Sequence, residues 1–98
     1  MNKREVVWTL KAQFALDRHY AYLHDISPQQ AWKVRQEIIR ITKSLSEQAE
    51  IYQLDEYYPE NPGNIRRFFR WSYRIVYQVR EQQVVILNIY HTSQAPEE

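Results

Sequence analysis

The spacing of hydrophobic residues follows a helical period in the first half of the chain and a strand period in the second. Residues 4–8 (REVVW) predict a short opening strand. From Leu10 to about His24 apolar residues recur three and four positions apart, which is typical of a helix with one buried face. The expected buried positions of this helix are Ala12, Ala15, Leu16, His19, Leu23 and Ile26.

A second helix is predicted to begin at the segment Ser27-Pro28-Gln29-Gln30. Ser27 is a favourable N-cap, Pro28 suits the first helical position because no N–H is needed there, and Gln30 completes a capping box. The two helices are only a few residues apart, so we expect an antiparallel αα-hairpin. The buried face of the second helix should comprise Ala31, Val34, Ile38, Ile41, Thr42 and Leu45.

Three strand-like segments follow a loop at residues 51–64, which contains the only glycine, Gly63. Residues 65–71 are rich in aromatics, and residues 73–80 alternate between apolar and polar residues except at Val76. Residues 84–91 are the most apolar and lack this alternation, which predicts a central strand covered on both sides. The order β-αα-βββ therefore predicts an α+β fold: an antiparallel αα-hairpin packed on a small, mainly antiparallel, twisted sheet. The alternating strand should place on one face Tyr73, Ile75, Tyr77 and Val79.

Length and composition limit the classes of protein to consider. A chain of 98 residues has room for one core, so residues 1–98 should form a single domain, with residues 92–98 as a flexible tail. There is no cysteine, which excludes disulfides and thiolate metal sites. We see no signal peptide and no run of the roughly 18–20 apolar residues that span a membrane, so we expect a soluble, cytoplasmic protein without a membrane partner. Neither a metal-ligand spacing nor a Gly-rich phosphate loop is present, and no cofactor is expected.

The charges are distributed unevenly, although the net charge is only +1. Residues 47–60 contain five acids and no Lys or Arg, whereas residues 65–80 contain five arginines and no acid. An acidic loop that precedes an arginine-only strand segment indicates a surface for anions or for an acidic partner.

The order and spacing of these features resemble the RelE/ParE toxin superfamily over residues 8–96. The string Tyr73-Arg74-Ile75-Val76-Tyr77, followed by a strand that ends in His91, is the most specific match. The other matching pieces are Trp8 at the end of the first strand, inward Ala12, Leu16 and Leu23, the turn Ser27-Pro28 before Ala31, the pair Arg66-Arg67, and Ile86-Leu87-Asn88-Ile89-Tyr90-His91.

This resemblance implies a growth-inhibiting toxin of a type II toxin–antitoxin pair, related to ParE-like plasmid stabilisation proteins and neutralised by a cognate antitoxin. RelE-like members cleave mRNA on the ribosome, whereas ParE-like members poison DNA gyrase without being nucleases. A common fold cannot decide between these two mechanisms, so the site residues must.

The nuclease interpretation would use Arg74, Arg67 and His91 as catalytic residues. Cleavage through a 2′-hydroxyl needs a base, a cation for the phosphate and an acid for the leaving oxygen. The resemblance places Arg74 and Arg67 as phosphate-binding cations and His91 as the acid or base. In the alternative interpretation, Arg74 braces the sheet or contacts an antitoxin carboxylate. His91 is then a packed, hydrogen-bonded residue without a catalytic role. Glu56 is a further candidate for the base.

The acidic loop favours the binding interpretation, whereas the tail weakens both mechanisms because it lacks cations that could bind phosphate or a partner's acids. RelE-like nucleases carry lysines or a positioned carboxylate before the second strand, whereas this loop is acidic and would repel RNA. The tail reads Thr92-Ser93-Gln94 where many members carry arginine. We therefore predict a ParE-like protein that acts on gyrase through a protein contact. A ribosome-dependent endoribonuclease and an inactive, antitoxin-binding relic remain alternatives, and a homodimer or a hetero-oligomer with the antitoxin is left open. The expected partner-binding residues are Arg66, Arg67, Arg70, Tyr73 and Tyr90.

Overall fold

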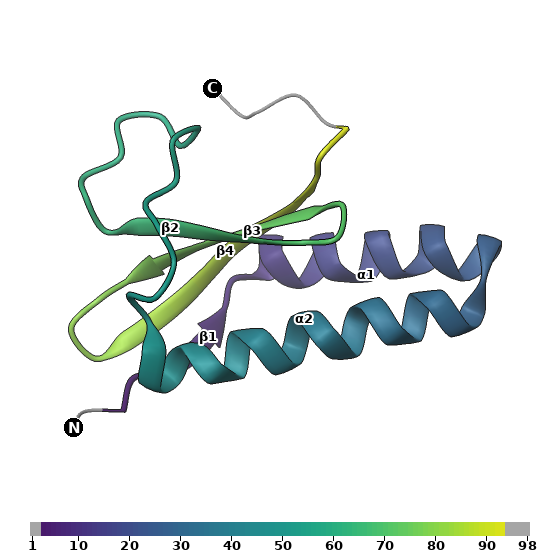
Figure 1. Ribbon diagram of the computed structural model, residues 1–98, viewed down its shortest axis with the longest axis horizontal. Coiled ribbons are helices and arrows are strands. Elements are labelled where there is room, and N and C mark those ends of the chain that lie inside the picture. Colours follow the sequence, from purple (N-terminus) through teal and green to yellow (C-terminus); the bar gives the residue numbers. More distant parts are fainter. Residues whose placement is uncertain (1–2, 94–98) are drawn as a thin grey trace.

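The computed structural model describes residues 3–93 and confirms the predicted α+β order β-αα-βββ (Figure 1). The expectation of a flexible tail at residues 92–98 therefore lies, from residue 94 onward, outside the described residues. The elements are β1 (Glu5–Trp8), α1 (Leu10–Ile26), α2 (Pro28–Gln48), β2 (Ile65–Arg70), β3 (Tyr73–Val79) and β4 (Gln83–His91).

The four strands form one sheet in the order β1-β4-β3-β2. β1 pairs with β4 in parallel, and the other two pairs are antiparallel, as a mainly antiparallel sheet requires. Figure 1 shows α1 and α2 side by side on one face of the sheet, with the long loop between α2 and β2 rising from the opposite side. We call the first the helix face and the second the outer face.

β4 is a central strand, as predicted, and a β-bulge adds a second reason for its irregular pattern. Val76 of β3 pairs with Asn88, but the next residue, Tyr77, pairs with Ile86, so Leu87 is an extra residue in β4. A bulge reverses the alternation of the residues beyond it. Both Ile86 and Ile89 consequently face the helices, although they are three positions apart.

The two helices begin as their sequences predict. Ala12 donates its N–H to the Thr9 hydroxyl at 3.0 Å at the start of α1, and Gln30 donates its N–H to Ser27 at 3.3 Å at the start of α2. The predicted capping box is only half formed. The Ser27 N–H donates instead to the Leu23 carbonyl at 2.7 Å, where it closes the end of α1.

The predicted buried stripe of α1 is wrong at one position. Ile26 is 67% exposed, because the joined ends of the two helices extend past the sheet (Figure 1). The stripe of α2 is buried at Ala31, Ile38, Ile41, Thr42 and Leu45 and half-buried at Val34. Within residues 3–93 no helix is long and apolar enough to cross a membrane.

Tyr77 connects the core of the sheet to the end of α2. Its side chain is 0% exposed, and its hydroxyl donates to the carbonyl of Ala49 at 2.8 Å. Burial raises the pKa of this hydroxyl well above its ordinary value, so it stays protonated as the donor. The bond fixes the point where the chain leaves α2 and enters the long loop.

Replacing Tyr77 by phenylalanine should test this link. Tyr77→Phe keeps the ring but leaves the Ala49 carbonyl without its donor, so we expect a loss of about 1–3 kcal/mol in the free energy of unfolding. Urea unfolding of the purified protein measures it. Tyr22→Phe is the matched control, because Tyr22 is 68% exposed and its replacement should change stability little. Equal effects of the two substitutions would contradict this role for Tyr77.

Candidate functional site

The alternation of β2 and β3 divides the arginine run between the two faces of the sheet. In the β2–β3 register Arg67 pairs with Val76 and Phe69 with Arg74, whereas Arg66 pairs with Tyr77. Paired residues share a face and consecutive residues do not. Arg67 and Arg74 therefore lie on the outer face, and Arg66 and Arg70 on the helix face.

The loop of residues 49–64 is fixed against the edge of β2 and covers part of the outer face. Asp55 donates its N–H to the Ile65 carbonyl at 2.9 Å, and Arg67 donates its N–H to the Gln53 carbonyl at 3.1 Å. Asn61 holds the far side of the loop: its amide donates to the carbonyls of Asp55 and Ile65 at 3.0 and 2.8 Å. Its Oδ1 accepts the N–H of Gly63, whose φ of 106° suits glycine.

Arg74 is paired with an acid of its own chain. Its Nη1 donates to Oδ1 of Asp55, and the exposed fractions of the two side chains are 8% and 0%. The guanidinium also lies between two aromatic rings, 5.2 Å from the centre of Tyr57 and 4.4 Å from that of Tyr90. The cation predicted to bind phosphate is thus neutralised and covered by the acidic loop.

Arg67 is paired in the same way, but nearer to the surface. Its Nε and Nη2 donate to the two carboxylate oxygens of Glu56 at 3.1 and 3.0 Å, a bidentate geometry. This hydrogen bonding lowers the pKa of Glu56 below its usual value. Glu56 is therefore a charged partner of Arg67, and its geometry gives no support to the role of catalytic base.

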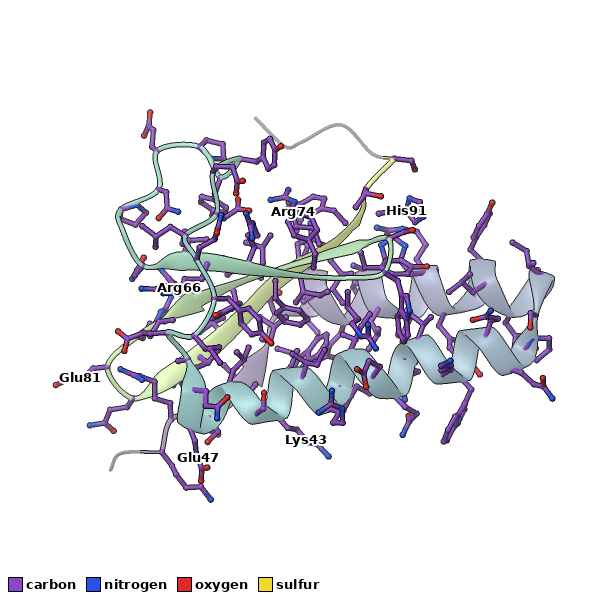
Figure 2. All side chains as sticks on the ribbon, in the orientation of Figure 1. Lys43, Glu47, Arg66, Arg74, Glu81 and His91 are labelled. Carbon is purple, nitrogen blue, oxygen red and sulfur yellow. The ribbon has the colours of Figure 1, made fainter. Side chains whose placement is uncertain are left out.

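His91 lies on the helix face, away from Arg67 and Arg74. It pairs in register with Tyr73, and the two rings form an edge-to-face contact with centroids 5.3 Å apart. Its Nδ1 accepts the N–H of Ser93 at 3.1 Å. Figure 2 labels Arg74 on β3 and His91 at the end of β4. The sheet separates the two side chains, so the three nuclease candidates do not meet around one phosphate.

The predicted partner-binding residues also divide between the faces. Tyr90 lies on the outer face against Arg74, whereas Tyr73 is 5% exposed and belongs to the core of the helix face. Arg66 donates to the Tyr52 carbonyl, and Arg70 donates to Glu37 at 3.0 Å. A single arginine surface is therefore not what the fold presents, because sequence neighbours on a strand point in opposite directions.

A groove at the joined end of the helices is the site that the sequence did not reveal. It has a volume of about 440 Å³ and lies between the α1–α2 turn and the β2–β3 turn. Its wall includes the exposed residues Ile26 and Trp71 together with Lys33 and His91, and it contains no acid from the described part of the chain, residues 3–93. Across residues 3–93 no cluster of three or more His, Cys, Asp or Glu side chains could hold a metal ion.

Trp71 projects at the rim of this groove from a strained turn. The φ angle of Trp71 is 52°, and the residue lies in a two-residue β-hairpin connection where glycine or asparagine is usual. The side chain of Trp71 is 45% exposed. The Arg70 guanidinium lies 4.0 Å from the centre of the ring, and the Lys33 ammonium 5.8 Å. The Glu37 carboxylate accepts a hydrogen bond from Arg70 and so holds the guanidinium in place. The pKa of Glu37 is lowered to about 2, mainly by the hydrogen bond that Glu37 accepts from Arg40.

The chain is similar to known proteins over nearly its whole length. The family model described as the ParE toxin of the type II toxin–antitoxin system, parDE, matches residues 6–96. A solved chain of the chromosomal ParDE TA system from P. aeruginosa is 27% identical, with a TM-score of 0.70 over 91% of this chain and 96% of that one. A chain of the toxin–antitoxin complex RelBE2 (Rv2865-2866) from Mycobacterium tuberculosis has the same fold, at 19% identity and a TM-score of 0.63 over 96% and 97% of the two chains. No curated protein sequence matches.

The two ion pairs of the outer face should differ sharply in their contribution to stability. Asp55→Asn leaves a buried guanidinium without its counter-charge, so we expect a loss of about 3–5 kcal/mol in the free energy of unfolding. Glu56→Gln, the matched control, removes an exposed carboxylate and should cost about 0–1 kcal/mol. Chemical denaturation measures both. Equal losses of unfolding free energy in the two variants would show that the buried Asp55–Arg74 pair contributes no more to stability than the exposed pair.

Proposed function

Because the chain belongs to the ParE toxin family of type II toxin–antitoxin systems, we propose that it arrests growth by binding DNA gyrase. A cognate antitoxin neutralises it in this proposal. Membership of the family makes the chain a toxin component. Gyrase as the target is the part that we infer, from the resemblance and from the chemistry of the outer face.

The pairing of Arg74 with Asp55 is the observation that supports a binding mechanism. An RNA-cleaving site needs a cation open to the phosphate and an acid or base close to the same phosphate. Here the buried Asp55 carboxylate occupies the guanidinium of Arg74, and Glu56 occupies that of Arg67. His91 lies on the other face of the sheet. A toxin with this arrangement acts more readily through a protein contact than through phosphate chemistry.

The groove beside Trp71 is the surface that we assign to the antitoxin. Large aromatic anchors in partly desolvated pockets carry most of the binding energy of protein interfaces, and Trp71 and Ile26 supply exposed apolar area here. Lys33 adds positive charge, Arg70 lies against the Trp71 ring while paired with Glu37, and the wall has no acid among residues 3–93. The fitting partner is an amphipathic antitoxin segment that carries both apolar and acidic side chains. Of the predicted arginine run, only Arg70 serves this surface.

Inducible expression in bacteria without the antitoxin tests the mechanism. Growth, nucleoid morphology and mRNA integrity are followed together for the wild type and for His91→Ala. We expect both proteins to arrest growth with filamentation and DNA damage while mRNA stays intact. Rapid mRNA cleavage that is lost in His91→Ala would instead establish an endoribonuclease. Folded protein without any growth arrest would leave an antitoxin-binding relic.

Replacing Trp71 tests the antitoxin surface. Trp71→Ala removes the proposed anchor, and we expect the dissociation constant of the antitoxin complex to rise at least tenfold, the size of effect typical of an interface hot spot. Trp32→Ala is the matched control, because Trp32 is 60% exposed on α2 but does not line the groove. Isothermal titration calorimetry compares the two. An unchanged affinity of Trp71→Ala would place the antitoxin elsewhere.

A further inference from the structure

The outer edge of β2 is open along the second half of the strand. β2 lies at one edge of the sheet, so one side of its backbone is hydrogen-bonded to β3 and the other side faces away from the sheet. Arg67 donates its N–H to the Gln53 carbonyl, on the side away from β3. The direction of the backbone groups alternates along a strand, so the N–H and C=O of Phe69 point to the same side as those of Arg67.

The first half of this edge is already covered by an extended part of the same chain. The loop after α2 runs antiparallel to the start of β2, with Leu54 opposite Arg66 (Figure 1). Continuing this register would place Ile51 opposite Phe69. The chain does not continue in this way, because the Ile51 N–H donates to the Gln48 carbonyl at 3.2 Å at the end of α2. The strand position beside Phe69 is therefore left vacant by the loop.

Three successive backbone groups on the open edge have no partner. They are the C=O of Arg67, the N–H of Phe69 and the C=O of Phe69, and within residues 3–93 no hydrogen bond reaches them. The order acceptor, donor, acceptor is the one that a further strand matches. The side chain of Phe69 is 46% exposed, so this part of β2 lies at the surface.

The usual protections of an edge strand are missing at this place. Lysine, proline or a β-bulge commonly keeps other strands from pairing with an exposed edge. Residues 65–71 contain neither lysine nor proline, and the pairing of β2 with β3 runs without a bulge. The three arginines of β2 are each hydrogen-bonded within the chain, so they are held over the two faces of the sheet: Arg66, Arg67 and Arg70. The edge itself is left accessible.

The open edge leads directly to the groove beside Trp71. Phe69 precedes Trp71 by two residues, and Trp71 lies in the β2–β3 turn that forms part of the groove wall. A partner segment in the groove can therefore continue along β2. Strand addition of this kind gains affinity from main-chain hydrogen bonds and specificity from the side chains beside them.

We propose that the open edge of β2 binds an extended segment of the antitoxin, which adds a strand to the sheet beside Phe69. This inference rests on the assignment of the groove beside Trp71 to the antitoxin and extends it. The added strand donates to the carbonyls of Arg67 and Phe69 and accepts the N–H of Phe69. The occupant is an extended segment because the neighbouring half of the same edge already pairs with one, the loop around Leu54.

Hydrogen exchange of the purified chain, alone and in complex with the antitoxin, tests the added strand. The Phe69 amide should exchange rapidly in the free chain and at least tenfold more slowly in the complex. The Phe68 amide is the internal control, because it faces β3 and should exchange slowly in both states. A complex in which Phe69 exchanges as fast as in the free chain would overturn the added strand and leave the groove assignment standing.

Two further outcomes of this experiment count against the proposal. Protection of Phe69 without antitoxin, rising with the concentration of the chain, would show that a second copy occupies the edge. The absence of any complex with the antitoxin would defeat the proposed function, and the added strand with it.

Two substitutions separate the backbone of Phe69 from its side chain. Phe69→Pro removes the outward N–H, which β3 does not use, and edge strands tolerate proline at such positions. Phe69→Ala removes the ring but keeps both backbone groups. We expect the dissociation constant of the antitoxin complex to be roughly tenfold higher for Phe69→Pro than for Phe69→Ala, because the partner's carbonyl loses its donor. Calorimetric titration measures both, and circular dichroism checks the fold. Equal affinities of the two variants would contradict the added strand; should Phe69→Pro not fold, hydrogen exchange of the wild type decides.

Discussion

The buried ion pair between Asp55 and Arg74 is the interaction on which the rest of the outer face depends. Removing two charges from water is costly, and a buried pair persists only where the geometry and further contacts compensate. Here the compensation comes from the stack of Arg74 between Tyr57 and Tyr90 and from the backbone bonds that seat the loop on β2. Within residues 3–93 the second oxygen of Asp55 is nevertheless buried without a hydrogen-bond partner, which opposes the stabilisation that the pair provides.

Because the Asp55–Arg74 pair neutralises a cation of the outer face, the two sides of the molecule differ in their surface chemistry. On the outer face the arginines are already neutralised. On the other side, the groove at the end of the helical hairpin combines the exposed Trp71 with the ammonium of Lys33 on its wall. The outer face of this chain thus presents covered cations, and the end of the hairpin presents a partly apolar groove, an arrangement that supports the proposed binding mechanism.

The sequence predicts the fold well because helix caps and hydrophobic periods are local signals. Ser27 and Pro28 locate the start of α2, and the alternation of β3 identifies the residues that face the helices, since both depend on residues within a few positions. The alternation does not predict that Arg74 and Val76, on the opposite face, are buried as well. The site could not be predicted in this way. Asp55 reaches Arg74 across 19 positions, a bulge at Leu87 decides where Asn88 points, and Trp71 occupies a turn position that usually takes glycine or asparagine. The sequence suggested a single arginine surface because residues that are neighbours in a strand point to opposite faces of the sheet.

The central claim is that this toxin acts on a protein target because its outer-face cations are covered by its own acids. The most direct measurement combines the purified chain with purified DNA gyrase and plasmid DNA, and in parallel with ribosomes that carry mRNA. The account predicts that gyrase accumulates cleaved DNA and loses supercoiling activity, that the antitoxin restores it, and that the mRNA remains intact. Unimpaired gyrase together with cleaved mRNA would contradict the account.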